Sequence, residues 1–174
     1  MTREQLAQRI ADVALLRGEF TLRSGRKSNY YLDKYRFETQ PEVLNEIGKM
    51  LAAHVTDEID RIAGPELGAV ALATAASLQS GKPCVFVRNA KKDYGSSKQI
   101  EGVLNDGDRV LLIEDIVTSG GQLVEAVKTL QNAGARVIKA ICIIDREEGG
   151  REAIEAAGIR FESLFKTSDL GIKA

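Results

Sequence analysis

Residues 110–122 read VLLIEDIVTSGGQ, an apolar run that ends in two carboxylates and a turn. The four apolar residues predict a buried strand, and the hydroxyl- and glycine-rich turn after Val117 predicts the start of a helix. Backbone N–H groups in such a turn, together with the positive end of the helix dipole, favour a bound phosphate. Glu114 and Asp115 then lie one sugar's width from that phosphate, where ribose hydroxyls would be. We therefore predict a site for a ribose 5-phosphate.

A simpler interpretation of this segment is that Glu114 and Asp115 cap a helix and that the glycines form a tight turn. Each feature is common by itself, but their combination at the end of a central strand favours the phosphate site. Two other phosphate-binding patterns are absent from the sequence. Gly81-Lys82 is followed by Pro83, which fails the P-loop pattern, and no Gly-x-Gly-x-x-Gly follows the first expected core strand.

Five apolar runs alternate with helix-like stretches along the chain, and this alternation predicts a parallel sheet. The runs are residues 61–64, 84–87, 110–113, 137–144 and 160–164. The helix-like stretches are residues 68–80, 122–133 and 150–157, each followed by a glycine, at Gly81, Gly134 and Gly158. Right-handed crossovers place helices on both faces, and ligands then bind beyond the carboxyl ends of the strands. We expect an α/β fold with a parallel five-stranded core sheet and helices on both faces.

The first 40 residues are expected to form a small N-terminal hood, made of a helix and a hairpin, outside the core sheet. Thr2 and Gln5 fit a capping box, and the apolar face that follows predicts a helix that ends at Gly18. Residues 20–22 and 30–32 then predict two short strands joined by a turn.

The length suits a single domain, residues 1–174, with the hood at 1–40 and the core at 41–174. Pro41 fits the first turn of a helix that leads into the core. Residues 88–106 are a long polar connection without a clear helix or strand period, and we interpret them as a flap over a ligand site.

The composition is that of a soluble globular protein, with 44% hydrophobic and 28% charged residues. A formal net charge of -1 argues against a broad basic surface, so no nucleic-acid partner is expected. No apolar stretch resembles a signal peptide or a membrane span, and we expect a cytoplasmic location without membrane contact. Cys84 and Cys142 lack the spacing of metal ligands or redox pairs, and we expect both to be buried.

Residues 113–122 resemble the donor-binding signature of the type I phosphoribosyltransferases, which bind phosphoribosyl diphosphate. Three further segments resemble stretches that occur together in orotate phosphoribosyltransferases. They read FTLRSGRKS followed closely by YY (residues 20–31), FVRNAKKDYG (residues 86–95) and IDREEGG (residues 144–150). The resemblance spans residues 20 to about 165, and several segments in the expected order are more specific than one motif.

The resemblance implies transfer of a phosphoribosyl group from its 1-diphosphate to N1 of orotate, which gives orotidine 5'-monophosphate and pyrophosphate in pyrimidine biosynthesis. Mg²⁺ is the implied cofactor, held mainly by the diphosphate and water rather than by a protein metal site. Lys92, Glu114 and Asp115 are the expected catalytic residues. The expected donor-binding residues are Arg23, Arg88, Lys92, Tyr94, Glu114, Asp115, Ile116, Val117, Thr118, Ser119, Gly120, Gly121 and Gln122.

For the base, the resemblance carries over Thr118 and Arg146. The Arg146 guanidinium can pair with the orotate carboxylate through two hydrogen bonds. In the family the flap closes over the neighbouring subunit's site, which implies a homodimer in which Lys92 and Tyr94 act in trans. A closed flap would also exclude water from the reactive sugar.

Three positions depart from the family's pattern. Asn89 stands where many relatives have lysine, which weakens the expected positive field at the diphosphate. Tyr94 stands where bacterial relatives often have histidine, and Arg23 stands where lysine is frequent. Arg23 or Lys27, in the expected hairpin, would still lend positive charge to the diphosphate.

Simpler interpretations stay open for several of these residues. Arg146 can form a surface ion pair with Glu147 or Glu148, as arginines in such company often do. Lys91 and Lys92 can be a solvated pair on a loop.

Tyr30 and Tyr31 can pack against the core or touch the base, and the sequence does not favour either. His54 is expected to be structural. Two other functions compete with the main one: transfer to a purine base, and a regulatory protein that keeps the ribose-phosphate site as a sensor. The second of these usually needs a DNA-binding module or a basic face, and neither is visible in the sequence.

Overall fold

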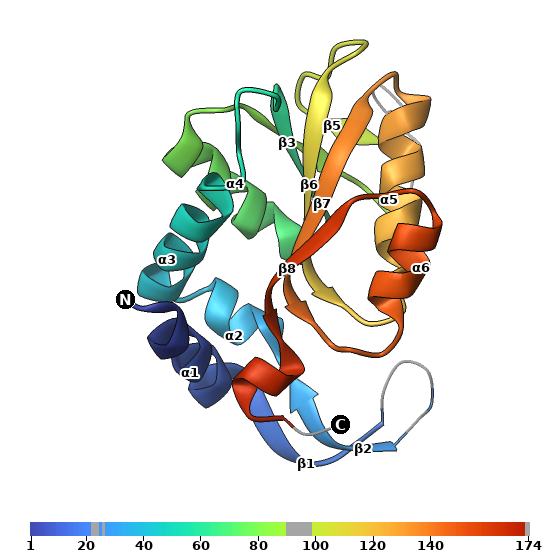
Figure 1. Ribbon diagram of the computed structural model, residues 1–174. Helices are drawn as coiled ribbons and strands as arrows, with labels where there is room; N and C mark the ends of the chain where they lie inside the picture. Colours follow the sequence, from blue (N-terminus) through green and yellow to red (C-terminus); the bar gives the residue numbers. More distant parts are fainter. Residues whose placement is uncertain (22–24, 26, 90–98, 173–174) are drawn as a thin grey trace.

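The computed structural model describes residues 1–21, 25, 27–89 and 99–172, and its centre is a six-stranded sheet (Figure 1). The strand order is β5-β4-β3-β6-β7-β8. The bounds are β3 Arg61–Pro65, β4 Cys84–Val87, β5 Ile100–Glu101, β6 Arg109–Val117, β7 Arg136–Asp145 and β8 Phe161–Lys166. All neighbours among β3, β4, β6, β7 and β8 run parallel, which confirms the predicted α/β fold.

The edge strand β5 was not predicted. It pairs antiparallel with β4 through two residue pairs, Phe86 with Glu101 and Val87 with Ile100. Two residues are too few to display an alternating pattern, so the sequence carries no signal for this strand. The expectation that residues 88–106 contain no strand is therefore wrong at this point, and residues 90–98 lie outside the described part of the chain.

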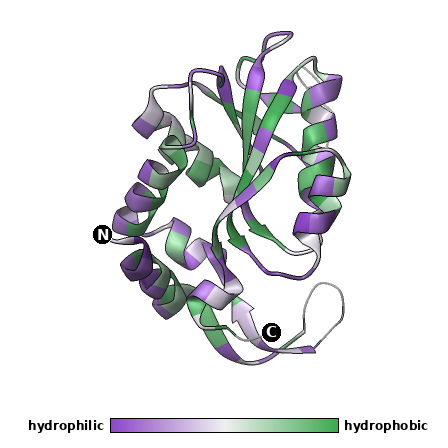
Figure 2. Cartoon of the chain, viewed as in Figure 1, coloured by the Kyte–Doolittle hydropathy of each residue, from purple (hydrophilic) through white to green (hydrophobic). Residues whose placement is uncertain are grey.

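Helices cover both faces of the sheet (Figure 1). One face carries α3 Pro41–Ala52 and α4 Gly68–Ser80, and the other carries α5 Gly121–Asn132 and α6 Gly150–Ala156. Successive side chains of β6 point to opposite faces. Leu111 thus packs in the cluster with α3 and α4, whereas Leu112 packs in the cluster with α5 and α6. Figure 2 shows the corresponding pattern, with apolar strands between helices whose outer faces are polar.

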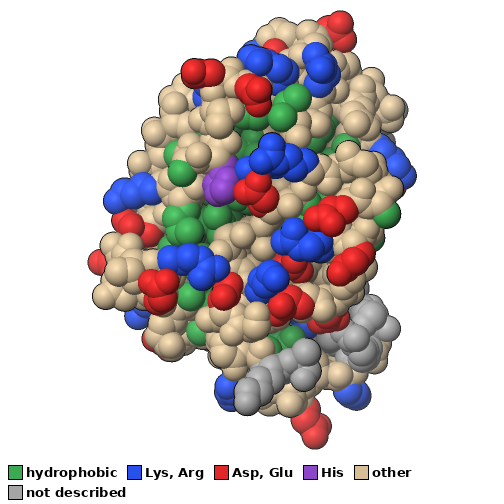
Figure 3. All heavy atoms as spheres, in the orientation of Figure 1, with side chains coloured by type: hydrophobic (Ala, Val, Ile, Leu, Met, Phe, Trp, Pro, Cys, Tyr) green, Lys and Arg blue, Asp and Glu red, His purple; other side chains and the backbone are tan. Residues whose placement is uncertain are grey.

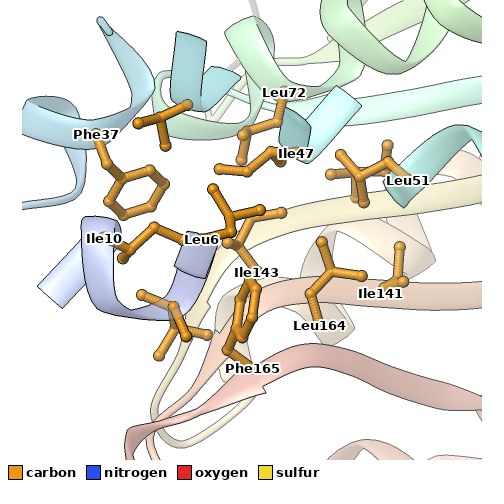
Figure 4. Close-up of a cluster of buried hydrophobic side chains, with 14 of the residues drawn as sticks. Leu6, Ile10, Phe37, Ile47, Leu51, Leu72, Ile141, Ile143, Leu164 and Phe165 are labelled. Carbon is orange, nitrogen blue, oxygen red and sulfur yellow. The ribbon is translucent and has the colours of Figure 1, made fainter. Parts of the chain in front are cut away.

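The hood consists of α1 Arg3–Ala14, a hairpin of β1 Leu15–Thr21 and β2 Lys27–Leu32, and the short helix α2 Lys34–Glu38. The predicted capping box is confirmed, because Thr2 and Gln5 exchange both hydrogen bonds at the start of α1. Figure 4 shows how the hood is anchored, since buried side chains of α1 and α2 meet side chains of the core. The labelled residues there include Leu6, Ile10, Phe37, Ile47, Leu72 and Phe165.

The prediction that the first helix reaches Gly18 is wrong. The helix ends at Ala14, and Gly18 lies inside β1 with a φ of 154°. The pairing register of the hairpin shifts between Arg17 and Phe20, so this glycine belongs to an irregular stretch of strand. Glycine serves both purposes, as a helix end and as a bulge residue, and the sequence alone does not separate them.

The predicted start of α3 at Pro41 and the predicted bounds of α4, residues 68–80, agree with the structure. A short 3-10 helix, Thr167–Leu170, follows β8 and was not predicted. Within the described residues, no helix has both the length and the apolar character that crossing a membrane requires.

Candidate active site

The turn after β6 forms a small hollow at the start of α5. The hollow has a volume of about 80 Å³ and is lined by Glu114 and residues 116–123. Gly120 is the N-cap residue of α5 and has a φ of 79°, a backbone conformation that residues with a side chain rarely adopt. A Cβ there would also lie 2.9 Å from the carbonyl oxygen of Gly150. The turn therefore packs tightly against α6, and its shape requires glycine.

A larger cleft of about 520 Å³ adjoins this hollow, and both are lined by Glu114, Gly121 and Gln122. The cleft lies at the carboxyl ends of β3, β4 and β6, where an α/β sheet is expected to bind ligands. It is lined by Lys34, Tyr35, Pro65, Glu66, Leu67, Val87, Arg88, Asn89, Gln99, Glu114, Asp115, Gly121, Gln122, Glu125, Ala126 and Thr129. The structure thus brings Arg88 and the segment 114–122 together, as the sequence predicts.

Glu114 and Asp115 are both buried, with exposed fractions of 8% and 4%. Glu114 Oε1 accepts a hydrogen bond from the Asp115 backbone N–H at 3.0 Å. Burial, together with the charge of Asp115, raises the pKa of Glu114 to about 8. The raised pKa favours the protonated carboxyl group, which can both donate and accept a hydrogen bond. Such a pair is suited to two neighbouring hydroxyl groups.

Lys34 completes this group and was not predicted. It comes from α2 of the hood, and its ammonium forms an ion pair with Asp115 Oδ2. Burial acts to lower the pKa of Lys34, but the hydrogen bond and charge of Asp115 outweigh burial and raise it. The two residues are 81 positions apart, so no local pattern in the sequence indicates the contact.

Glu38, at the end of α2, is a third buried acid near this pair, and it too was not predicted. Its exposed fraction is 3%, and its Oε1 has no hydrogen-bond partner among the described residues. Burial raises the pKa of Glu38 to about 8, and the negative charge of Asp115 is the second largest cause of this shift.

The loops after β3 and β4 meet at the other side of the cleft. Arg88 lies within 3.8 Å of both Glu66 and Glu101, and its buried Nε has no hydrogen-bond partner in the described part. Asn89 donates from its backbone N–H to Glu66 Oε1 at 2.9 Å, and its side-chain amide lies 3.4 Å from the Glu66 carbonyl. Asn89 therefore ties the two loops together. Glu66 was not predicted as a site residue, because its own segment contains no motif that indicates a contact with Asn89.

Arg146 lies beyond β7, next to the turn, and its backbone N–H donates to the Val117 carbonyl at 2.9 Å. Its guanidinium pairs with Glu148 at 3.0 Å and donates to the Tyr30 hydroxyl at 3.0 Å. The Arg146 side chain is only 12% exposed, and its buried Nε has no partner among the described residues. The predicted ion pair of Arg146 with Glu148 is therefore present. It is not a solvated surface pair, because the Arg146 side chain is largely buried.

Tyr30 packs partly against the core and holds Arg146, with the guanidinium carbon 5.3 Å from its ring centre. Tyr31 is 44% exposed and lies beside Phe20, with the ring centres 5.7 Å apart. Thr118 lines the small hollow. Arg146 thus lies next to the turn that contains Thr118, although Arg146 is not among the residues that line the small hollow or the large cleft.

Three predicted site residues, Arg23, Lys92 and Tyr94, lie outside the described residues. Lys27 is described, and its ammonium donates to the Thr21 hydroxyl at 2.9 Å. His54 contacts Lys139 and Glu162 and does not line the cleft, and Figure 3 shows the histidine between basic and acidic side chains on one face of the molecule.

Comparisons with known proteins agree with this geometry. The family model described as "Phosphoribosyl transferase domain" matches residues 35–161. An orotate phosphoribosyltransferase of Methanocella arvoryzae is 48% identical over 153 residues, which cover 88% of this chain and 87% of that protein. The chain belongs to the orotate phosphoribosyltransferases.

Solved structures of orotate phosphoribosyltransferases have the same fold. The enzyme of Mycobacterium tuberculosis in complex with Fe(III) dicitrate is 34% identical, with a TM-score of 0.88, and the match covers 98% of this chain and 99% of the other. The same enzyme in complex with 5-phospho-α-D-ribosyl 1-diphosphate gives a TM-score of 0.83 at 34% identity, with 98% and 99% covered. The resemblance noted in the sequence is therefore confirmed at the level of the whole fold.

Proposed function

We propose that the protein transfers a phosphoribosyl group from 5-phosphoribosyl 1-diphosphate to orotate, yielding orotidine 5'-monophosphate and pyrophosphate in pyrimidine biosynthesis. One observation carries this proposal. Two buried acids, Glu114 and Asp115, lie near the end of the central strand β6, and the turn after this strand forms a hollow at the start of α5 that adjoins a cleft of about 520 Å³. The reaction follows from the family to which the chain belongs, and the hollow and the cleft could hold the phosphate, ribose and diphosphate of the donor.

The phosphate of the donor would bind at the turn 118–121 and the start of α5, which line the hollow, because backbone N–H groups at a helix start favour phosphate. The ribose hydroxyls would then meet Glu114 and Asp115. The diphosphate would extend through the cleft towards Arg88, whose guanidinium offers a donor without a partner among the described residues. Lys92 and Tyr94, from the flap, and Arg23, from the hairpin, would complete the diphosphate site.

In the reaction the bond between C1 of ribose and the diphosphate oxygen breaks, and the electron pair leaves with the diphosphate. N1 of orotate forms the new bond to C1 and gives up its proton, which leaves with the pyrophosphate. Positive charge develops on the ribose and negative charge on the leaving group, so fixed charges accelerate the reaction most when they are aligned beforehand. Arg88 and Lys92 stabilise the leaving group in this scheme, and the acids at the end of β6 hold the ribose.

Arg146 would bind the carboxylate of orotate, and Thr118 would contact the base. The support is the free Nε of Arg146 beside its Nη2, since the two nitrogens form the fork that binds a carboxylate through two hydrogen bonds. Tyr30 holds the guanidinium from the hood side. An incoming carboxylate would then compete with Glu148 for the same group.

Mg²⁺ fits this site as an ion carried by the diphosphate, because the cleft is lined by acids and this ion prefers oxygen ligands and water. Glu66, beside Arg88, would meet its water shell. When bound, the ion would neutralise part of the charge on the leaving diphosphate. Among the described residues, no group of three His, Cys, Asp or Glu side chains could hold a metal ion.

We further propose a homodimer in which the part of the flap that precedes β5 closes over the partner's cleft, since Ile100 and Glu101 are paired with β4. The support is the family and the position of Arg88 and Asn89, where the flap leaves the rim of the cleft. Two inactive variants, Lys92→Ala and Asp115→Asn, should restore part of the activity when mixed. In a dimer that contains one chain of each variant, one of the two active sites has both an intact Lys92 and an intact Asp115. No recovery on mixing would mean that the flap serves its own chain.

The direct test of the function is release of pyrophosphate by the purified protein with Mg²⁺ and the donor, in the presence of orotate, uracil, adenine, guanine or hypoxanthine. We expect release with orotate alone and a large loss in the Lys92→Ala variant. Activity with a purine and none with orotate would overturn the proposal.

A further inference from the structure

The hood reaches into the proposed sugar site through one side chain. Lys34 is at the start of α2, and its ammonium lies against Asp115 at the end of β6. The Lys34 side chain is 30% exposed and the Asp115 side chain 6%, so the pair is largely shielded from water. Lys34 also lines the cleft.

Asp115 is fixed from three sides. Lys34 holds Oδ2, and the backbone N–H of Ile116 donates to Oδ1. The third side is the first turn of α4, where Gly68 lies so close that a Cβ on it would be 1.7 Å from Asp115 Oδ2 and 2.9 Å from Lys34 Nζ. Glycine at this position leaves the space that the ion pair fills. The carboxylate therefore has a single orientation, set by α2, α4 and the end of β6.

The charges around the pair make Lys34 important for the two neighbouring acids. Glu114 and Glu38 are both buried, and the positive charge of Lys34 lowers the pKa of each against the combined effects of burial and Asp115. Glu38 additionally faces Asp33. Removal of one partner from a buried pair leaves an uncompensated charge, which is strongly unfavourable. Loss of Lys34 would therefore disturb Asp115 directly, and Glu114 and Glu38 through the loss of its charge.

We infer that Lys34 is a positioning residue for the sugar end of the donor, which acts through Asp115 and couples the placement of the hood to ribose recognition. The inference rests on the proposed function, because it assumes that Glu114 and Asp115 bind the ribose hydroxyls. It makes the hood part of the donor site.

The test is calorimetry with two separate halves of the donor, ribose 5-phosphate and pyrophosphate with Mg²⁺, on Lys34→Met. Ribose 5-phosphate should bind about tenfold to a hundredfold more weakly, while pyrophosphate binding should stay within about twofold of wild type. Loss of pyrophosphate affinity instead would overturn the inference, because Lys34 would then touch the diphosphate directly. Lys49→Met, which removes an exposed lysine of α3 paired with Glu46, is the matched control.

A double-mutant cycle separates action through Asp115 from an independent effect. In an Asp115→Asn background, Lys34→Met should cause little further loss of ribose 5-phosphate affinity, since its partner is already altered. Additive losses would contradict the inference. If Asp115→Asn itself leaves ribose 5-phosphate affinity unchanged, the proposed sugar site fails. If Asp115→Asn weakens binding and Lys34→Met does not, only the role of Lys34 fails.

A second variant covers the case in which Lys34→Met does not fold. Lys34→Arg keeps the positive charge and a hydrogen-bond donor, and we expect it to fold and to bind ribose 5-phosphate within about threefold of wild type. Thermal unfolding would establish folding for each variant. A folded Lys34→Arg that binds as weakly as Asp115→Asn would overturn the inference.

Discussion

The two ends of the proposed donor and base site are built differently. At the sugar end, Asp115 is already paired with Lys34, and the turn at Gly120 is packed against α6. At the diphosphate and base end, Arg88 and Arg146 each have a buried Nε without a partner among the described residues, and each pairs with an acid that a ligand can replace. The sugar end is thus fixed by the fold, whereas the other end holds its cations in exchangeable ion pairs. Ribose binding should consequently depend on fixed geometry, and binding of the diphosphate and the base on replacement of the acids that pair with Arg88 and Arg146.

The largest expected effect comes from breaking the fixed end. Asp115→Asn removes the charge that Lys34 balances and the acceptor proposed for a ribose hydroxyl, so kcat/KM for the donor should fall about a hundredfold or more. Steady-state kinetics with the donor varied would measure this loss. Asp12→Asn, at an exposed position of α1, should behave as wild type. A loss confined to the KM of orotate would contradict the assignment.

A somewhat smaller effect is expected at the exchangeable end. Arg146→Ala should lower kcat/KM for orotate by roughly tenfold to a hundredfold, because a carboxylate loses a two-point hydrogen-bonded partner. The KM of the donor should change little. Arg160→Ala, which removes an arginine that is 70% exposed, is the control. Equal losses for donor and orotate would remove the distinction between the two ends.

A pH experiment tests the buried acids beside the fixed end. The folded protein holds the pKa of Glu38 at about 8, above its ordinary value, so its neutral form is favoured and its contribution to stability falls as pH rises from about 5 to 8. Glu38→Gln removes this loss and should be more stable than wild type at pH 8, by on the order of 2 kcal/mol, with little difference at pH 4.5. Urea unfolding at both pH values would show the effect.

The control for that experiment is Glu42→Gln, at an exposed position in the first turn of α3, which should not change the pH dependence of stability. Parallel stability curves for wild type and Glu38→Gln would mean that folding does not raise the pKa of Glu38.

The smallest expected effect sharpens the contrast. Glu148→Gln weakens the ion pair that occupies Arg146, so the KM of orotate should fall by about twofold to fivefold while the KM of the donor stays the same. Kinetics with orotate varied at saturating donor would detect this gain in affinity. An increase in the KM of orotate would indicate that Glu148 orients Arg146 rather than competing for it.

Features whose residues are contiguous in the sequence could be predicted well. The helix α4 has glycine signals at both ends, and the segment 110–122 contains strand, acids and turn in one run, so both could be predicted from local patterns. The two-residue strand β5 and the bulge at Gly18 have no distinctive pattern of their own.

Contacts between distant segments explain what was missed at the site. Lys34 meets Asp115 across 81 positions, and Glu66 meets Asn89 across 23, so each depends on how the hood and the strand ends come together. Glu38 in particular follows no motif, and its importance arises from burial beside other acids. These residues become visible only when the packing of α2 against the sheet ends is known.

A crystal structure of the protein with ribose 5-phosphate tests the fixed end of the site most directly. The phosphate should accept hydrogen bonds from the backbone N–H groups of residues 118–121, with the ribose hydroxyls on Glu114 and Asp115 and with Lys34 still paired to Asp115. A phosphate bound instead on Arg88, with the turn after β6 empty, would contradict the account.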